Sequence, residues 1–289
     1  AIAASAALVR QYFTEGWYPS GTKRPDQAFV PSGALLKATL LNSTRNMTGT
    51  DAFGVAAPVN GYPTNIEGWG ELVLDDALYF AGDARNMWAW DVRHAGGLST
   101  GETHSYFLPV ATNTQPLKVT LTWMEPPAAN ANFGTPVVND VNLRLTAPDG
   151  TTVFLGNNFN AGQSVTGGAF DGVNNVEMVL VNTPQTGTWR IEVIGTAINQ
   201  GNPSQGYALV ATADTQDPPT PTGVQNTLVL RASMPGTTPA GAPGLSTCQN
   251  LMTNINNYIS EVSYGQTTIV PVFREITLTT PLGTYLSND

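Results

Sequence analysis

The sequence has very little cysteine, histidine and charge. Its 289 residues include one cysteine, Cys248, and two histidines. A single cysteine cannot form an internal disulfide, so the fold does not depend on an oxidising compartment. Only 11% of the residues are charged, and 12 basic against 21 acidic residues give a net charge of −9. Because an acidic chain repels phosphate backbones, this balance argues against nucleic acid as a partner.

Long hydrophobic runs are missing as well. No stretch of about 18 apolar residues occurs, so no membrane span is encoded. Ala1 to Val9 lacks a basic region and is too short for a signal peptide. Asn, Thr, Gly and Pro are plentiful, as in exported β-rich proteins, and we expect a secreted, extracellular protein. The glycosylation triplets at Asn42 and Asn46 are interpreted as chance matches.

The stretch from Leu117 to Thr212 is predicted to form one antiparallel β unit. Apolar and polar residues alternate in three segments, 117–123, 141–146 and 189–193. Period-two alternation places one set of side chains on a buried face and the other in water. Two segments that favour turns, Pro148-Asp149-Gly150 and Pro184-Gln185-Thr186-Gly187, separate the strands. The pattern predicts a mainly β protein built on an antiparallel, jelly-roll-like β-sandwich.

Other segments flank this unit. Ala-rich Ala1 to Phe13 and Leu-rich Pro31 to Ser43 are predicted helices, and Leu72 to Phe80 is a short strand or helix. We expect four parts. They are helices at 1–82, the sandwich at 83–215, a Pro-rich linker at 216–224 and a small α/β segment at 225–289. Within the last part, a strand at 227–233, a helix from Ser246 or Thr247 to about Val262 and a strand at 267–279 are predicted.

The first part carries a resemblance to a known family. The small-residue helix Ala1–Val9, the Leu-rich segment Leu35–Leu40 and Gly68-Trp69-Gly70 followed by Leu74 resemble, in this order, the C-terminal end of a subtilisin-like serine protease domain. The sandwich resembles the domain that follows it in alkaline, oxidant-resistant subtilases. The segments that carry this second likeness are 137–143, 147–150, 171–177 and 184–189. The resemblance implies a secreted serine endopeptidase and covers about three quarters of the chain.

The sequence departs from that family in one large respect. The family's catalytic Asp, His and Ser and its oxyanion-hole Asn would lie before Ala1. The histidines present, His94 and His104, are interpreted as surface or strand residues. An activated serine needs a base within hydrogen-bond reach, and no such pair is recognisable. We therefore assign no catalytic residue, and expect the chain to be inactive alone.

Oxygen-rich clusters at predicted strand ends suggest a metal site. Calcium prefers six to eight oxygen ligands in irregular geometry, and the subtilase resemblance makes calcium plausible. Carboxylates must supply the charge, so the candidate ligands are Asp140, Asp171, Asn175 and Glu177. The alternative is turn chemistry, in which Asn and Asp side chains bond their own backbone.

The tail resembles a different family. The strand–helix–strand pattern with Glu261-Val262-Ser263-Tyr264-Gly265-Gln266 is similar to the opening of secreted gametolysin or immune-inhibitor-like zinc metallopeptidases. The zinc-binding His-Glu-x-x-His helix of those enzymes would follow Asp289, so no zinc is expected in this segment. An ordinary small α/β appendage remains the alternative.

Two functions follow from these patterns. In the first, the chain is the non-catalytic C-terminal part of a secreted protease, and the rest of the protease domain packs on residues 1–80 and on the C-terminal segment. In the second, it is a catalytically silent structural or self-assembling subunit that packs on another copy. Both need a partner if Ile2, Val9, Leu35, Leu36 and Leu40 are exposed. The tryptophans Trp69, Trp88 and Trp90 suggest either a carbohydrate platform or, as we prefer, positions on two faces of a strand or at a domain interface.

Overall fold

The structure, a computed structural model, describes seven stretches of the chain. They are residues 1–50, 62–127, 137–200, 204–215, 223–233, 249–255 and 267–277. The chain divides into two compact units, residues 1–218 and 219–289, and each is described by itself.

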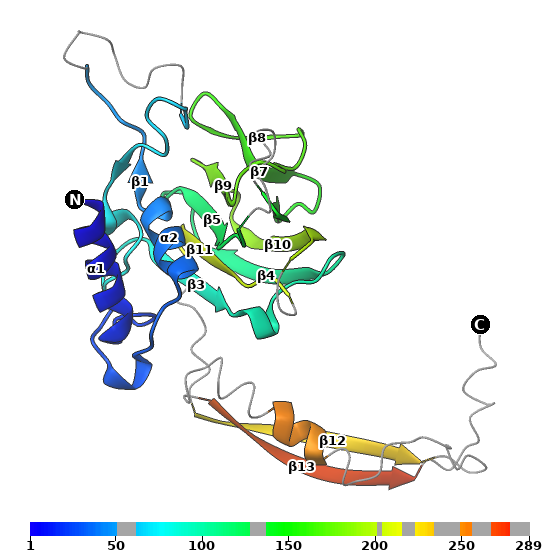
Figure 1. The fold of residues 1–289 in the computed structure, drawn as a ribbon. Coiled ribbons are helices and arrows are strands. Elements are labelled where there is room, and N and C mark those ends of the chain that lie inside the picture. Colours follow the sequence, from blue (N-terminus) through cyan, green and yellow to red (C-terminus); the bar gives the residue numbers. More distant parts are fainter. Residues whose placement is uncertain are drawn as a thin grey trace. The chain divides into compact units, whose positions relative to one another are not determined.

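The first unit contains a sandwich of two antiparallel sheets, which confirms the predicted mainly β fold. One sheet has the strand order β4-β10-β6-β7-β8 and the other β3-β11-β5-β9 (Figure 1). Their strands are β3 (Asn86–Val92), β4 (Thr103–Val110), β5 (Leu117–Trp123), β6 (Asn139–Thr146), β7 (Val153–Asn160), β8 (Gln163–Thr166), β9 (Val176–Val181), β10 (Gly187–Ile198) and β11 (Tyr207–Ala213).

The core lies between the two sheets. Its largest fully buried side chains include Trp123, Trp189, Tyr207, Leu121 and Leu143. They come from alternate strand positions, as the period-two pattern requires. Full burial of one such side chain stabilises the fold by about 1.5–3 kcal/mol. The alternating segments therefore provide the main hydrophobic core of the unit.

The four-stranded sheet is covered on its second face too. Every residue of β5 and β11 is buried. The prediction that the polar positions of 117–123 face water is therefore wrong. Lys118, Thr120 and Thr122 lie beneath a helix, and the Thr122 hydroxyl donates to the Ala34 carbonyl at 2.8 Å. Alternation identifies a more polar face, but it does not show whether another element covers that face.

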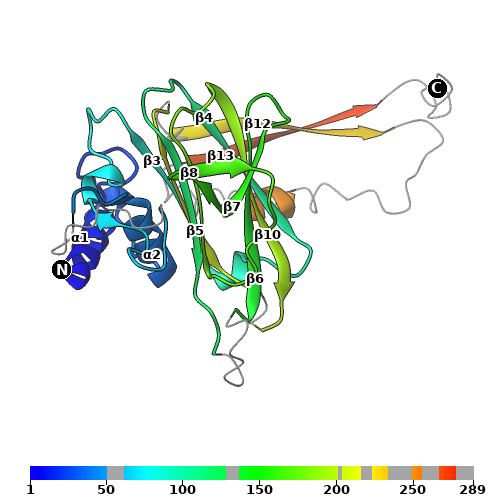
Figure 2. The ribbon, with the colours of Figure 1, turned by 90° about the horizontal axis from the view of Figure 1, so that it is seen from above.

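The helix layer consists of α1 (Ile2–Thr14) and α2 (Gly33–Asn42), as predicted from sequence. Figure 2 shows both helices on one side of the sandwich, against the four-stranded sheet. Ser32 caps α2 by accepting the Leu35 amide at 2.9 Å, because a side-chain oxygen satisfies an otherwise free N–H. Among the described residues, no helix is long and apolar enough to span a membrane.

The helices and the sheet share a second apolar core. Its members include Val9, Phe13, Leu35, Met87 and Val210. The expected exposure of Val9 and Leu35 is therefore wrong, because both are buried in this cluster, with α2 packed between α1 and the sheet. Leu36 and Leu40 are partly buried against the same cluster, whereas Ile2 stays exposed.

Short elements connect the layers. They are η1 (Pro25–Gln27), β1 (Thr44–Arg45), β2 (Glu71–Leu72), η2 (Leu74–Asp76) and η3 (His94–Gly96). The segment expected as a short strand or helix thus contains the end of β2 and a 3-10 turn. Asn42 is fully buried at the end of α2, and its Nδ2 donates to Lys118 O, Thr120 Oγ1 and Val210 O. A glycan cannot be attached there in the folded protein.

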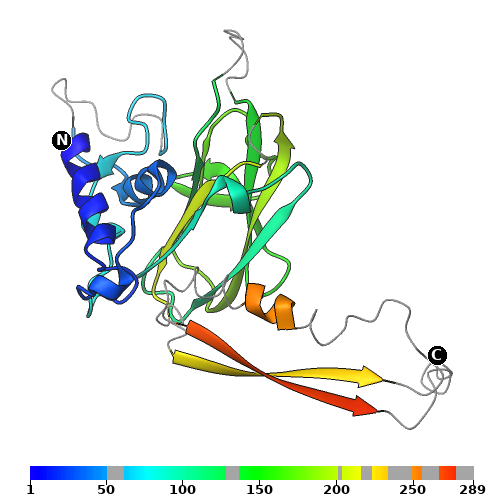
Figure 3. The same ribbon diagram turned by 60° about the horizontal axis from the view of Figure 1, so that its bottom comes forward.

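The second unit contains β12 (Gly223–Ser233) and β13 (Thr267–Thr277), paired in parallel (Figure 3). Residues 249–255, between them in the sequence, are helical. The predicted strand–helix–strand order is thus present. β12 begins at Gly223, so the last two residues of the expected linker belong to the strand. The rest of that linker, Cys248 and the remainder of the predicted helix lie outside the described residues.

Candidate functional site

A buried glutamate lies where β6 and β7 separate. The two strands pair only from Arg144↔Leu155 to Thr146↔Val153. Beyond that point Glu177, from β9 of the facing sheet, accepts the Leu143 amide through Oε2 at 2.6 Å. Gly156 leaves space for this carboxylate, because a Cβ there would lie 2.0 Å from Glu177 Oε2. A side chain thus replaces backbone pairing at this point in the sheet.

Two acceptor oxygens at this place have no partner. Glu177 and Asn142 are both fully buried, and no hydrogen bond reaches Glu177 Oε1 or Asn142 Oδ1 within the described part of the chain. The pKa of Glu177 is raised well above its ordinary value, first by burial and then by the charges of Asp171 and Asp140. The hydrogen bond from Leu143 opposes that rise. A buried acceptor without a donor is costly and needs an explanation.

Asp171 forms the turn that precedes β9. It accepts Asn157 Nδ2 at 2.5 Å, Asn174 Nδ2 at 2.7 Å and the Val173 amide at 2.9 Å. Burial raises the pKa of Asp171, but these hydrogen bonds outweigh burial and leave the pKa below its ordinary value. Asn157 is held in the left-handed region at φ 60° and accepts the Met178 amide at 2.9 Å. Its strained backbone is therefore fixed by several bonds.

Asp140 approaches the same turn from β6. Its Oδ2 lies 3.9 Å from the Cβ position of Gly172, and its Oδ1 accepts Asn142 Nδ2 at 2.8 Å. The pKa of Asp140 is raised, first by burial and then by the charges of Asp171 and Glu125, against the Asn142 bond. Asp140, Asp171 and Glu177 thus lie close enough for their charges to interact.

The fourth predicted ligand points elsewhere. Asn175 Oδ1 accepts Lys37 Nζ of α2 at 2.9 Å, and its Nδ2 donates to Trp123 O at 3.5 Å. This side chain joins the helix layer to the sandwich. The sequence did not show that Asn142 is fully buried and bonded to Asp140, because its polar position in an alternating strand looks like a water-facing one.

The donor set fits a hard cation better than zinc. Among the described residues, no three side chains of His, Cys, Asp or Glu form a metal-binding group. Calcium, however, also takes amide and backbone carbonyl oxygens. The free Glu177 Oε1 and Asn142 Oδ1, beside the charge of Asp140 and Asp171, are groups that a bound cation would satisfy. Zinc would need His or Cys ligands, which this cluster does not contain.

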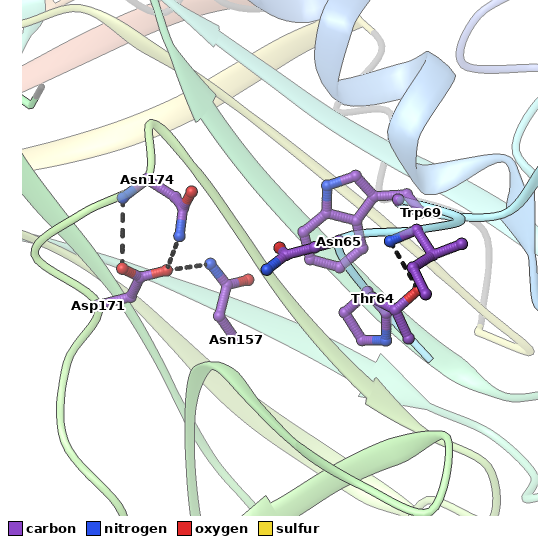
Figure 4. A pocket seen from close by; sticks show the side chains of 9 residues that line it. Thr64, Asn65, Trp69, Asn157, Asp171 and Asn174 are labelled. Atoms are coloured by element: carbon purple, nitrogen blue, oxygen red, sulfur yellow. Dashed lines mark hydrogen bonds between the residues drawn. The ribbon is translucent and has the colours of Figure 1, made fainter. Parts of the chain in front are cut away.

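A cavity of about 870 Å³ opens beside this cluster. Figure 4 shows Asn157, Asp171 and Asn174 on one side of it and Thr64, Asn65 and Trp69 on the other. The remaining described lining residues are Pro63, Ile66 and Gly68. One predicted ligand, Asp171, thus lines this cavity together with Asn157 and Asn174.

The histidines bond away from any nucleophile. His94 Nδ1 lies 2.8 Å from the Ser204 carbonyl, and His104 Nδ1 lies 2.8 Å from the Tyr207 hydroxyl. In the described stretches, neither ring contacts a serine hydroxyl or a thiol. The geometry here gives no reason to assign either histidine to catalysis.

The tryptophan pair is structural. Trp88 and Trp90 lie two positions apart on β3 and therefore share one face, not the two faces expected. Their rings are 5.9 Å apart, and Tyr106 lies 4.7 Å beyond Trp90. Trp88 Nε1 donates to Thr215 Oγ1 at 2.9 Å. Both tryptophans pack on the sandwich core, whereas Trp69 lines the cavity.

Comparisons with known proteins relate this chain to much longer ones. No family model matches it. It is 28% identical over 224 residues to the serine protease/ABC transporter B family protein tagA of Dictyostelium discoideum, covering 73% of this chain and 12% of the relative. The similarly named tagD and tagB of that organism are 26% and 27% identical, over 72% and 68% of this chain and 13% and 12% of theirs.

Solved structures align as well. The P-domain of Penaeus vannamei nodavirus covers 44% of this chain and 96% of its own length, with 12% identity and a TM-score of 0.20, which carries no argument. The similarity to the Dictyostelium discoideum proteins extends over more of this chain. The chain spans about one eighth of the length of these curated relatives. It is therefore similar, over most of its own length, to a small part of proteins named as serine proteases.

Proposed function

We propose that this chain is the non-catalytic C-terminal part of a secreted subtilisin-like serine endopeptidase, with the β-sandwich as its accessory, stabilising domain. The similarity to three relatives named as serine proteases supports the protease assignment. The subtilase-like segments at 1–80 and 137–189 support the finer one. The catalytic Asp, His and Ser would belong to another part of the enzyme, which would hydrolyse peptide bonds by acyl transfer.

The join between helices and sandwich is the observation that carries this proposal. α1 and α2, which resemble the end of a catalytic domain, share a continuous apolar core with the four-stranded sheet. Hydrogen bonds between the two layers add to it: Thr122 Oγ1 donates to the Ala34 carbonyl at 2.8 Å and Tyr18 Oη to the Ala89 carbonyl at 3.2 Å. Helices held in this way would couple a catalytic domain rigidly to the sandwich.

The free side of α1 offers the contact surface. Leu8 is 54% exposed among the exposed Ala3, Ala4 and Ala7, whereas Val9 and Phe13 are fully buried. Ile2 lies on the side of Val9 and is 60% exposed because it begins the helix. An exposed apolar face beside small alanines permits close approach of another backbone. We assign this face to the remainder of the protease domain.

A calcium ion at the Glu177 cluster would brace the sandwich. The unpaired Glu177 Oε1 would be a ligand, the charges of Asp140 and Asp171 would add to the attraction, and the ion would neutralise a buried charge. A chelator is then expected to lower the melting temperature of the calcium-loaded protein. Identical melting curves with and without calcium would contradict this part of the proposal.

The protease assignment is tested with a fluorophosphonate probe, which labels active-site serines of hydrolases. Material from the natural source is captured with an antibody against the sandwich and then labelled. A labelled polypeptide should co-purify or be part of the same chain, while the recombinant 289-residue chain stays unlabelled. Natural material without any label, or labelling of the recombinant chain alone, would overturn the assignment.

The contact surface is tested with variants of the recombinant chain. Leu8→Asp should weaken capture of the labelled polypeptide, because it places a charge on the apolar face of α1. Phe107→Asp is the matched control, since Phe107 is 59% exposed on β4 and outside the helix layer. Equal capture by both variants would place the contact elsewhere.

A further inference from the structure

The cavity beside the Glu177 cluster has the size of a small-ligand site. Its volume of about 870 Å³ falls within the range of about 300–1,000 Å³ that such sites occupy. One wall comes from the loop before β2 and the other from β7 and the turn before β9. Elements distant in sequence therefore meet around a single hollow.

Its charge restricts the ligand. Among its described lining residues, Asp171 is the only ionisable one, and Lys, Arg and His are absent. The whole chain carries a net charge of −9. A phosphorylated, sulfated or carboxylated ligand would be repelled, so a neutral ligand is favoured.

The aromatic part of the cavity is Trp69. Its ring packs edge-on against Phe159 with centroids 6.1 Å apart, and Tyr62 packs on the same phenylalanine at 6.2 Å. The indole is only partly covered, so it presents a flat apolar surface next to polar groups. Such a surface suits the C–H face of a sugar ring, which is apolar while its hydroxyls point outward.

The polar part is already ordered. Asp171 and Asn157 are fixed by the hydrogen bonds between them and to the adjacent backbone. Asn174 Nδ2 donates to Asp171 at 2.7 Å, which leaves the Asn174 oxygen available as an acceptor. On the opposite wall Thr64 Oγ1 accepts the Glu67 amide at 3.0 Å and holds the loop. A preformed wall binds its ligand without first losing side-chain entropy.

Asn65 is the free polar group. Its side chain makes no hydrogen bond with any described residue, and Figure 4 shows its amide directed toward Asn157. A primary amide can donate to one hydroxyl and accept from its neighbour, which matches vicinal hydroxyls. We propose that this cavity binds a neutral carbohydrate, with a sugar ring stacked on Trp69 and its hydroxyls bonded to Asn65, Asp171 and Asn174.

The test is isothermal titration calorimetry of the full chain with neutral oligosaccharides of glucose, mannose, galactose and N-acetylglucosamine. At least one is expected to bind with a Kd at or below about 1 mM. Trp69→Ala should weaken that binding at least about tenfold, and Asn65→Ala about threefold. Phe107→Ala, which removes an exposed aromatic ring outside the cavity, should leave it unchanged.

Several results would overturn the proposal. One is the absence of binding by every oligosaccharide up to about 10 mM. Another is binding that survives Trp69→Ala unchanged. If the melting curve shows that Trp69→Ala does not fold, Asn65→Ala becomes the deciding variant. Wild-type affinity of Asn65→Ala for the oligosaccharide would then rule out the site. A casein peptide mixture that binds in a Trp69-dependent way, when no oligosaccharide does, would assign the cavity to peptides instead.

Discussion

Two glutamates are buried in the sandwich, and the fold treats their charges in opposite ways. Glu192 on β10 faces Arg144 across the strand pair, accepts its Nε at 2.7 Å and its Nη2 at 2.9 Å, and also pairs with Arg190. Its pKa is lowered, first by the Arg144 hydrogen bond. Glu177 accepts one backbone amide and has a raised pKa and an unpaired oxygen.

The difference shows which of the two buried carboxylates finds its counter-charge within the chain. Paired and hydrogen-bonded carboxylates are tolerated in an interior, whereas an uncompensated one is costly. Glu192 has one counter-charge, Arg144, on the neighbouring β6 and another, Arg190, on its own strand, so its role is explained by the fold alone. Glu177 lies beside other carboxylates and lacks a counter-charge, so we infer that its partner is a cation from solution.

The largest expected effect is the loss of calcium stabilisation in Glu177→Gln. Calcium at a hundredfold excess over its Kd should stabilise the wild type by about 2.7 kcal/mol, which raises the melting temperature by about 5–10 °C. Gln keeps the shape but not the charge, so the variant should lose most of this shift in a calorimetric melt. Glu192→Gln is the control and should retain it. If Glu177→Gln kept the full calcium-induced rise in melting temperature, Glu177 would not be a calcium ligand.

A second effect concerns the same two variants without calcium. Glu192→Gln leaves Arg144 and Arg190 unpaired and should cost about 1–2 kcal/mol, reduced by the exposure of both arginines. Without a metal, burial favours the protonated, neutral carboxyl of Glu177, so Glu177→Gln should be neutral or stabilising. Denaturant unfolding in a chelator measures both free energies of unfolding. Equal losses in the two variants would mean that Glu177 is satisfied without a metal.

A third prediction extends the comparison to a buried cation. Lys118 donates its Nζ to the Thr44 carbonyl, and burial lowers the pKa of Lys118 from 10.5 to about 7. Between these two pH values the unfolded chain binds more protons than the folded one, so stability should rise with pH through that window. Lys118→Met should flatten the rise, as measured by unfolding at several pH values. The same slope in both proteins would show that Lys118 is not responsible for it.

The smallest expected effect is that of Asn175→Ala. This variant loses the hydrogen bond from Lys37, at a cost of about 1 kcal/mol. Its calcium shift should match that of the wild type, because Asn175 faces the helix layer and not the Glu177 cluster. A melt in which Asn175→Ala loses the shift would make Asn175 a ligand after all.

The sequence predicts where the strands lie better than it predicts which elements pack on them. The alternating segments 117–123, 141–146 and 189–193 lie within β5, β6 and β10, and both N-terminal helices are where their composition places them. Alternation did not show that α2 covers Lys118, Thr120 and Thr122, because periodicity describes one strand and not what packs on it.

The candidate site was predictable only in part, because a pattern within one strand does not show what packs on that strand. Carboxylates at strand ends identified Asp140, Asp171 and Glu177, whose charges do interact in the structure. The sequence did not show that Asn175 Oδ1 accepts Lys37 Nζ, or that Glu177 lies where β6 and β7 separate. No local pattern marks that separation, which a side chain from the opposite sheet fills.

The most direct test of a cation at Glu177 is a calcium titration of the full chain by isothermal titration calorimetry. The wild type and Glu192→Gln should each bind a single calcium ion per chain, and Glu177→Gln should bind none at that affinity. The absence of binding in the wild type, or equal binding by all three proteins, would contradict the assignment.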